Sequence, residues 1–370
     1  MKRRTLCGVA CLLAVLALGL SGAWAAENAK AEPKQDLPRP DGEPADMTKP
    51  VQVYILLGQS NMLGMGKVAG GEGSLENAVK AKKRYPYLVD EAGNWTVRKD
   101  VRNVRVMSSG TGSMKLFNNE WMTIKGKIGP EIGIGHYVGQ VTDAPVMILK
   151  SCIGNRSLGW DLLPPGSEQY EAEVTDKQGN KVTKVFAGYK DSPDSWVKGT
   201  EPQKITWYAG MQYDGDTANA KKVLAELEKY YPGAKKYEVA GFFFWQGDKD
   251  RYNAAHASRY EQNLVQFIKQ LRKDFNAPNA KFVVATLGQT KKGATGNEGK
   301  ILEAQLAVDG NSGKYPEFKG NVASVYSNPF CHGGASNSHY GGNAETYMDI
   351  GEAMGRAMVE LIGTSGGSSK

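Results

Sequence analysis

Short apolar runs separated by helical patterns are the feature that most limits how this chain can fold. Five such runs, rich in Val, Leu, Ile, Phe or Ala, occupy residues 51–57, 146–149, 239–245, 282–286 and 322–326. Continuous apolar runs of this length are typical of strands buried on both faces, as in a parallel sheet. Apolar residues also recur at helical spacing over 217–231, 264–275 and 347–361. The pattern predicts an α/β fold of three layers, with a central parallel sheet between helices.

The first 25 residues have the three parts of a secretory signal. Lys2, Arg3 and Arg4 supply the positive charge, residues 12–20 are apolar, and Ala23-Trp24-Ala25 fits a cleavage site. The apolar run is short for a membrane span, which takes ~20 residues. We therefore expect cleavage near Ala25, export to the periplasm or the extracellular space, and no stable membrane insertion afterwards.

The rest of the chain divides into a leader, one domain and a tail. Residues 26–50 are rich in Pro, Lys, Asp and Glu and predict a flexible leader. The α/β domain is expected over 51–363, followed by a disordered Gly/Ser tail at 364–370. Within the domain, 68–119 and 155–212 are long and polar, and we expect insertions that wall the ligand site.

Charge and residue pairing exclude several classes of function. The formal net charge is +7; without the three signal cations, 43 basic residues face 39 acidic ones. These charges are interspersed, so a nucleic-acid partner is not expected. No histidine pair has metal-ligand spacing and no glycine motif has the context of a nucleotide site, so neither metal nor cofactor is expected.

Four cysteines divide between the signal and the mature chain. Cys7 and Cys11 leave with the signal, and Cys152 and Cys331 remain. In an exported protein the remaining two could form one disulfide or stay as two buried thiols, and the sequence favours neither. A disulfide would join the loops that hold the residues discussed next.

The first apolar run leads directly into Gly58-Gln59-Ser60-Asn61-Met62. Ligands bind beyond the carboxyl ends of strands in open α/β sheets, so this segment faces the expected site. Glycine permits a tight turn there, and a serine at a helix start can aim its own N–H at a developing oxyanion. Residue chemistry alone leaves two interpretations open, in which Ser60 is a nucleophile or only a helix cap.

A serine nucleophile needs a base, and the chain has four histidines. His136 and His256 fall in predicted helices as surface or packing residues, and His332 lies in a loop with no evident acid partner. His339 lies just before the last helix, for which Asn343 is a plausible N-cap. His339 is therefore the candidate base, although an isolated histidine at such a position is usually structural.

These segments resemble blocks of the SGNH-type hydrolases, in the branch of sialate O-acetylesterases and acetylxylan esterases. Five blocks match in order: GQSNM at 58–62, GPE at 129–131, KSCIGNRSLGWDLLPP at 150–165, FWQGD at 244–248 and SHYGG at 338–342 with the helix behind it. The resemblance spans roughly 51–361, with both insertions poorly matched. It implies a flavodoxin-like sandwich and an esterase that removes acetyl groups from carbohydrate.

The resemblance also implies a role for each matching residue. Ser60 would attack the acyl carbon after His339 removes its proton. The backbone N–H groups of Ser60 and Gly154, with the side-chain amide of Gln246, would hold the oxyanion. Residues of the same blocks are expected to contact the substrate: Gln59, Asn61, Asn155 and Trp160.

One position departs from the family pattern. The family commonly has an acid three residues before its histidine, and here Ser336 occupies that place. A hydroxyl can orient an imidazole but does not stabilise an imidazolium as a carboxylate does. Either the site runs as a Ser–His dyad or another carboxylate serves, with Asp248 the first candidate and Asp250 and Glu131 weaker ones.

Three functions remain open from the sequence. The first is a carbohydrate O-acetylesterase, for which tryptophans of the second insertion offer apolar faces to sugar rings, if they are not simply loop packing. The second is an esterase for other acyl esters, which predicts a long apolar groove. The third is a non-catalytic sugar-binding relative, prompted by Ser336.

Overall fold

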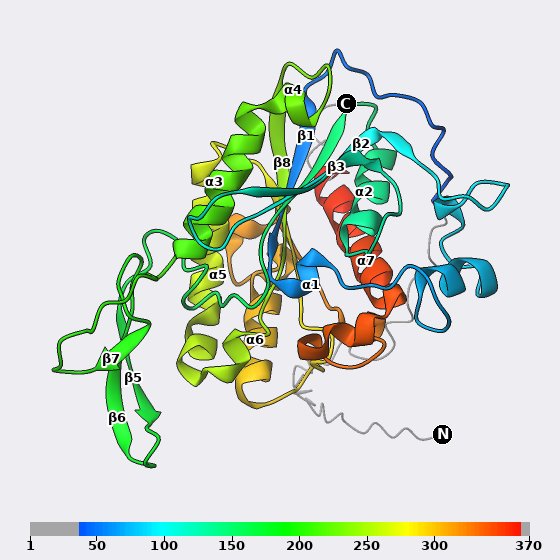
Figure 1. Ribbon diagram of the computed structural model, residues 1–370. Helices are drawn as coiled ribbons and strands as arrows, with labels where there is room; N and C mark the ends of the chain where they lie inside the picture. Colours follow the sequence, from blue (N-terminus) through cyan, green and yellow to red (C-terminus); the bar gives the residue numbers. More distant parts are fainter. Residues whose placement is uncertain (1–36, 364–370) are drawn as a thin grey trace, which may run out of the picture. The chain divides into compact units, whose positions relative to one another are not determined.

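A seven-stranded sheet forms the centre of the computed structural model, which describes residues 37–363 (Figure 1). Its strands are β1 (Val51–Gly58), β2 (Arg98–Met107), β3 (Lys115–Met122), β4 (Val146–Ser151), β8 (Tyr237–Trp245), β9 (Lys281–Ala285) and β10 (Val322–Val325). Their order is β10-β9-β8-β1-β4-β2-β3, and every neighbouring pair is parallel except β2 and β3. The signal peptide, residues 26–36 of the predicted leader and the tail at 364–370 lie outside the described residues.

Helices cover both faces of this sheet. The helices are α1 (Ser60–Leu63), α2 (Glu131–Gln140), α3 (Met211–Ala225), α4 (Leu227–Tyr230), α5 (Ala254–Asp274), α6 (Gly296–Ala307) and α7 (Ala344–Gly363). One apolar core joins the sheet to α3, α4, α5 and α6, and a second joins its other face to α2 and α7 (Figure 1). The predicted three-layer α/β fold is confirmed.

The first predicted insertion, 68–119, differs from the structure in its second half. It contains β2 and the first part of β3, which extend the main sheet at one edge. The apolar pattern did not predict β2, because this strand contains the charged residues Arg98 and Arg102. Both side chains are nevertheless almost fully buried. Arg98 pairs with Asp100 and donates to the His136 carbonyl, while Arg102 donates to the Tyr230 carbonyl. Buried charges are tolerated where such partners exist.

The second predicted insertion, 155–212, contains a separate sheet of three antiparallel strands. These are β5 (Tyr170–Thr175), β6 (Lys181–Phe186) and β7 (Ser195–Val197). The small sheet extends to one side of the layer that contains α3, α5 and α6 (Figure 1). Trp160 and Trp196 pack against a small apolar cluster at its base, so both of these tryptophans serve the packing of the insertion itself.

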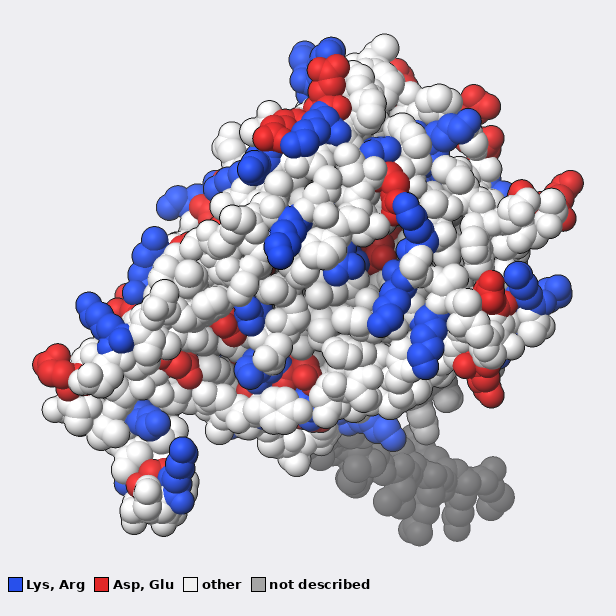
Figure 2. Space-filling view, viewed as in Figure 1, with Lys and Arg blue, Asp and Glu red and all other residues white. Residues whose placement is uncertain are grey.

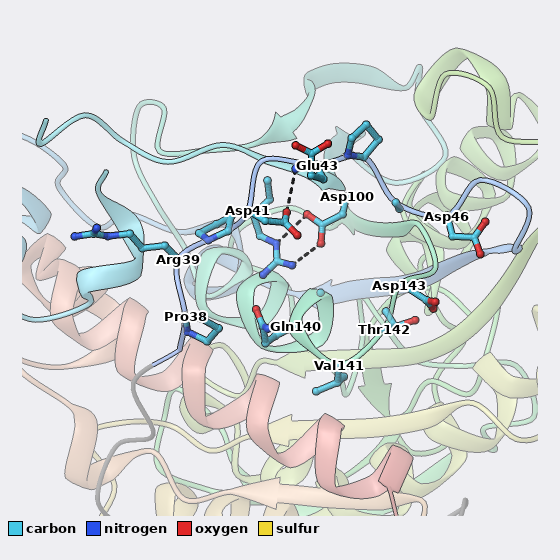
Figure 3. Close-up of a pocket in the computed structure, with 15 residues that line it drawn as sticks. Pro38, Arg39, Asp41, Glu43, Asp46, Asp100, Gln140, Val141, Thr142 and Asp143 are labelled. Atoms are coloured by element: carbon cyan, nitrogen blue, oxygen red, sulfur yellow. Dashed lines mark hydrogen bonds and ion pairs between the residues drawn. The ribbon is translucent and has the colours of Figure 1, made fainter. Parts of the chain in front are cut away.

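The described part of the predicted leader lies against the domain. Lys49 pairs with Asp143, and the Asp46 N–H donates to the Asp143 carbonyl at 2.8 Å. Residues 38–46 also form one side of a cavity of about 990 Å³, with residues 139–143 on the other (Figure 3). Asp46 and Asp143 precede β1 and β4. This cavity therefore lies at the amino ends of the strands, opposite the edge where Ser60 lies.

Charge is mixed on the surface. Figure 2 shows Lys and Arg side chains interspersed with Asp and Glu over the face that it presents. Within residues 37–363, no helix has the length and apolar character needed to cross a membrane.

Candidate active site

Ser60 is the first residue of α1, immediately beyond the carboxyl end of β1. Gly58 makes this turn possible, because its φ of +145° lies in a region that L side chains rarely adopt. A Cβ on Gly58 would also lie 2.3 Å from the Trp245 carbonyl oxygen at the end of β8. The two strand ends therefore meet closely, and the half-buried Ser60 follows at the edge of the sheet.

Replacing Gly58 with alanine is expected to lower the stability of the fold by about 2–4 kcal/mol, from backbone strain and the clash with Trp245. Thermal unfolding measures the change. Gly71→Ala is the matched control, since a Cβ there meets nothing within 4 Å and its φ is not left-handed. Equal unfolding temperatures for the two variants would contradict this account of the turn.

Gly154 lies beside Ser60, as an oxyanion site requires. A Cβ on Gly154 would lie 3.4 Å from the Ser60 Cβ. Among residues 37–363, neither the Ser60 N–H nor the Gly154 N–H donates a hydrogen bond. Two free backbone donors thus come from adjacent segments next to the serine hydroxyl, the arrangement that stabilises an oxyanion.

Gln246 does not fit the third donor position predicted for it. Its side chain is buried, and its amide nitrogen donates to the Arg156 carbonyl at 2.8 Å and to Asp250 Oδ2 at 2.6 Å. The same nitrogen lies 3.2 Å from Gln59 Oε1, and its carbonyl oxygen accepts from Tyr260. A primary amide has two N–H groups, so none is left for a substrate. Gln246 holds the surrounding loops in place.

Asp250 connects the loops that follow β4 and β8. It is fully buried and accepts from the Leu158 N–H at 2.9 Å, the Gly159 N–H at 2.8 Å and the Gln246 amide. Burial raises its pKa, although the positive charge of His256 and these hydrogen bonds oppose the rise. Because both carboxylate oxygens have partners in this network, Asp250 is not available as the acid of a triad.

The four predicted substrate-binding residues have different surroundings. Gln59 and Asn61 are 2% and 1% exposed, so both side chains lie beneath the surface rather than in a binding site. Trp160 is half-buried in the packing described above. Asn155 is exposed, with a left-handed φ of +56°, and is the one of the four whose side chain is open to a ligand.

His339 lies in a tight turn, Ser336–Gly342, that contacts α1. His339 and Tyr340 both adopt left-handed conformations, with φ of +53° and +52°, which costs about 1–3 kcal/mol each. The surrounding structure holds them there. Tyr340 stacks on Trp245 with ring centroids 5.7 Å apart, and its hydroxyl accepts from the Gly288 N–H. The Lys67 N–H donates to the Gly342 carbonyl at 2.9 Å and ties the turn to the segment that follows α1.

The helix that begins with Ser60 contacts the turn that carries His339, without a direct hydrogen bond between the two side chains. Within the described part of the chain, no hydrogen bond joins the Ser60 hydroxyl to the His339 ring. Catalytic hydrogen bonds are often long in ligand-free enzymes and shorten when substrate binds.

Asn343, predicted as the N-cap of the helix behind this turn, accepts a hydrogen bond from the Thr346 N–H at 2.9 Å, which confirms that prediction.

Asp248 reaches the histidine turn through Ser336. The buried Ser336 hydroxyl donates a short hydrogen bond to Asp248 Oδ1, and Arg251 Nε donates to the same oxygen at 2.9 Å. Arg251 also pairs with Glu298 on α6. A carboxylate from the loop after β8 therefore lies against the position where the family resemblance expects an acid.

Glu131, a weaker candidate for the acid, has another role. Its carboxylate pairs with the buried Lys150 at 2.6 Å and accepts from the Gly129 N–H. Lys150 also donates to the carbonyl of Leu63, at the end of α1. This buried pair supports the helix that carries Ser60.

Both cysteines of the domain are free thiols, so the disulfide alternative is not what the structure shows. Burial raises the pKa of Cys152 to about 12 and that of Cys331 to about 11. The disfavoured thiolates make both cysteines poor nucleophiles.

Within residues 37–363, no group of three His, Cys, Asp or Glu side chains is placed to bind a metal ion.

Two of the other three histidines, His136 and His256, are buried. His136 is buried, and burial lowers its pKa far below the usual value. His332, for which the sequence offered no acid partner, lies 3.8 Å from Asp349. His256 packs against Gly159 and contacts Asp194 at 2.9 Å, which joins the small sheet to the loop network.

The His256–Asp194 pair is expected to stabilise the fold more at low pH. Burial alone would lower the pKa of His256, but the hydrogen bond and the charge of Asp194 outweigh burial and raise it. The contribution of a raised pKa is complete below the unfolded value and is lost as pH rises through the folded one. Asp194→Asn should cost about 1 kcal/mol at pH 5 and progressively less toward pH 9. Chemical denaturation at both pH values measures this; a constant difference would contradict it.

Residues 195–360 match the family model described as carbohydrate esterase, sialic acid-specific acetylesterase. The matched segment includes Gln246, Asp248 and His339 and begins after Ser60. No curated protein matches the sequence. The match confirms the family resemblance predicted from the sequence blocks.

Solved structures also resemble the chain. A protein from Arabidopsis thaliana is 16% identical, with a TM-score of 0.46, over 84% of this chain and 98% of its own. A carbohydrate acetylesterase from Xanthomonas citri is 14% identical, with a TM-score of 0.47, over 84% of this chain and 56% of its own. NanS is 14% identical, with a TM-score of 0.38, over 75% of this chain and 78% of its own. At these identities no activity is transferred from them.

Proposed function

We propose that this chain removes O-acetyl groups from sugars, with Ser60 as nucleophile and His339 as base. The premise is the match to the carbohydrate esterase family described above, whose members are carboxylic ester hydrolases. One observation supports this most. Ser60 lies at the carboxyl edge of the sheet with Gly154 against it and two unused N–H groups beside its hydroxyl. The turn that carries His339 contacts the same helix.

The proposed reaction has two halves. The Ser60 hydroxyl attacks the acetyl carbon while His339 takes its proton, and the N–H groups of Ser60 and Gly154 hold the oxyanion. His339 then protonates the departing sugar oxygen, which leaves as a hydroxyl, and the acetyl group stays on Ser60. In the second half His339 deprotonates a water molecule that attacks this ester, and it then returns the proton to the Ser60 oxygen as acetate is released. We further propose that Asp248 supplies the negative charge that stabilises protonated His339, which the contact with Ser336 supports.

Three acetyl esters separate this function from its alternatives: p-nitrophenyl acetate, acetylated xylan and O-acetylated N-acetylneuraminic acid. Acetate release from either carbohydrate supports the proposal. Release from p-nitrophenyl acetate alone would favour an esterase for other acyl groups. No release from any of the three by folded protein would favour a non-catalytic sugar-binding relative.

We also propose export with cleavage near Ala25, which the charged and apolar segments of residues 1–25 support. The full chain expressed in a bacterial host should appear outside the cytoplasm, with a new N-terminus at or next to Ala26. A cytoplasmic protein that keeps Met1-Lys2-Arg3 at its N-terminus would contradict export.

A further inference from the structure

The backbone of His339 has a conformation that contacts from outside its own turn must maintain. Its φ of +53° is left-handed, and the next residue, Tyr340, has the same strained conformation. Residues with a Cβ are uncommon in this region and persist there only where the surrounding structure holds them. The direction of the His339 ring depends on this backbone. Any group that holds the backbone therefore also holds the candidate base.

The hydroxyl of Tyr347, the fourth residue of α7, holds this backbone directly. It donates a hydrogen bond to the His339 carbonyl at 3.3 Å. Tyr347 is completely buried. A hydrogen bond in such a water-excluded place is stronger than one at the surface, and removing its donor leaves a carbonyl without its partner.

The same hydroxyl also binds the segment that follows the candidate nucleophile. Burial raises the pKa of Tyr347, and the hydrogen bond that the Met65 N–H donates to its oxygen opposes the rise. Met65 lies two residues beyond α1, the helix that Ser60 begins. Among residues 37–363, no backbone carbonyl accepts from the Met65 N–H. One hydroxyl therefore joins the segment of the nucleophile to the carbonyl of the base.

The ring of Tyr347 is fixed, so its hydroxyl has a fixed place. The ring packs edge-on against Trp245, with centroids 5.8 Å apart, and against Tyr340, with centroids 6.1 Å apart. Gly66 is also close, because a Cβ there would lie 3.1 Å from Tyr347 Cδ2. Trp245 is the last residue of β8. The end of the central sheet therefore sets the position of the hydroxyl that holds His339.

We propose that Tyr347 is a positioning residue for ester hydrolysis, whose hydroxyl holds the turn of His339 against the segment that carries Ser60. This inference rests on the proposed function and adds a residue to it. Tyr347 is too deeply buried to touch a substrate, so it acts only through the backbone of His339. Because His339 moves protons in both half-reactions, both depend on this hydroxyl.

Tyr347→Phe tests the inference, since it keeps the ring and removes only the hydroxyl. We expect kcat to fall about 10- to 100-fold with p-nitrophenyl acetate and with an acetylated sugar, as for a misplaced catalytic group. KM should stay within about threefold of the wild type, because acylation and deacylation slow together and no substrate contact is lost. A kcat within threefold of the wild type in folded Tyr347→Phe would overturn the inference.

Tyr231→Phe is the matched control. Tyr231 is also completely buried, and its hydroxyl donates to a backbone carbonyl, that of Asp100, at 3.0 Å. Asp100 lines the cavity at the amino ends of the strands, at the opposite edge of the sheet. Both variants should lose thermal stability, but Tyr231→Phe should keep the wild-type kcat. Equal losses of kcat in the two variants would show a general effect of stability and overturn the inference.

Hydrogen exchange tests the contact without catalysis. In Tyr347→Phe the backbone amides of residues 336–342 should exchange about 5- to 50-fold faster than in the wild type, and in Tyr231→Phe they should not. Unchanged exchange in Tyr347→Phe would overturn the inference even if activity fell. The wild type alone gives a further test that needs no variant to fold. The Met65 amide should exchange slowly, and exchange as fast as in an unfolded chain would overturn the inference.

His339→Ala separates failure of this inference from failure of the proposed function. Loss of activity in His339→Ala beside full activity in Tyr347→Phe would overturn the role of Tyr347 and leave the esterase function intact. Wild-type rates in His339→Ala, or no acetate release from any ester by the folded wild type, would contradict the proposed function and the inference with it.

Discussion

Replacing Ser60 with alanine is expected to reduce acetate release by about 10⁴- to 10⁶-fold, because the covalent half-reaction has no other nucleophile. The fold should be unaffected. Within the described residues the Ser60 hydroxyl donates no hydrogen bond, so its removal leaves no buried partner unsatisfied. Initial rates with p-nitrophenyl acetate and an acetylated sugar, with thermal unfolding beside them, measure both expectations.

Ser258→Ala is the control for this change. Ser258 is an exposed serine on α5 whose hydroxyl donates to the Ala255 carbonyl, and it has no role in the proposed reaction. It should retain wild-type rates. Ser60→Ala protein that is folded and within tenfold of the wild-type rate would show that the nucleophile lies elsewhere.

Replacing Asp248 with asparagine is the second change with a large expected effect. If its carboxylate stabilises protonated His339, kcat should fall by about 10³- to 10⁴-fold, the loss that follows removal of a triad acid. Glu298→Gln is the matched control, because Glu298 is the other partner of Arg251. A structural ion-pair role would give both variants similar losses, whereas a charge role confines the loss of kcat to Asp248→Asn.

The contact between Ser336 and Asp248 permits a reciprocal test. Ser336→Asp alone places two carboxylates side by side, which raises the pKa of one of them and should lower activity. Combining Ser336→Asp with Asp248→Ser exchanges the two groups and puts the acid where the family commonly has it. We expect the double variant to recover at least a tenth of the wild-type kcat. A double variant no more active than Asp248→Asn would contradict the proposal that Asp248 supplies the charge.

Local chemistry was enough to predict the strand and loop positions that carry the candidate site. Buried parallel strands need apolar side chains on both faces, so β1, β4, β8 and β9 were visible as continuous runs. Gly58 and the following Ser60 were visible because a tight turn at a strand end needs glycine. Asn343 was predictable as an N-cap because such a side chain accepts a hydrogen bond from a backbone N–H only three residues later in the chain.

Only the tertiary structure decided which polar side-chain atoms have hydrogen-bond partners within the protein and which do not. Gln246 has two partners near it in the chain, Asp250 and Tyr260, and two that are 90 and 187 positions away, and together they convert a predicted oxyanion donor into a buried bridge. Ser336 and Asp248 meet across 88 positions. Strand β2 joined the sheet because its arginines found carbonyl and carboxylate partners in other elements.

Arg156 shows the same division most clearly. The sequence placed it two residues after Gly154, but a guanidinium is neutralised, buried or available according to what surrounds it. Ser109, Trp207 and Gln212 hold it, and its positive charge acts on the buried carboxylates of Asp161 and Asp216. Apolar periodicity and turn chemistry act between near neighbours in the chain, so the sequence determined the order of strands, helices and reactive loops. Hydrogen-bond saturation depends on atoms far apart in sequence, so only the fold decided which of those residues can meet a substrate.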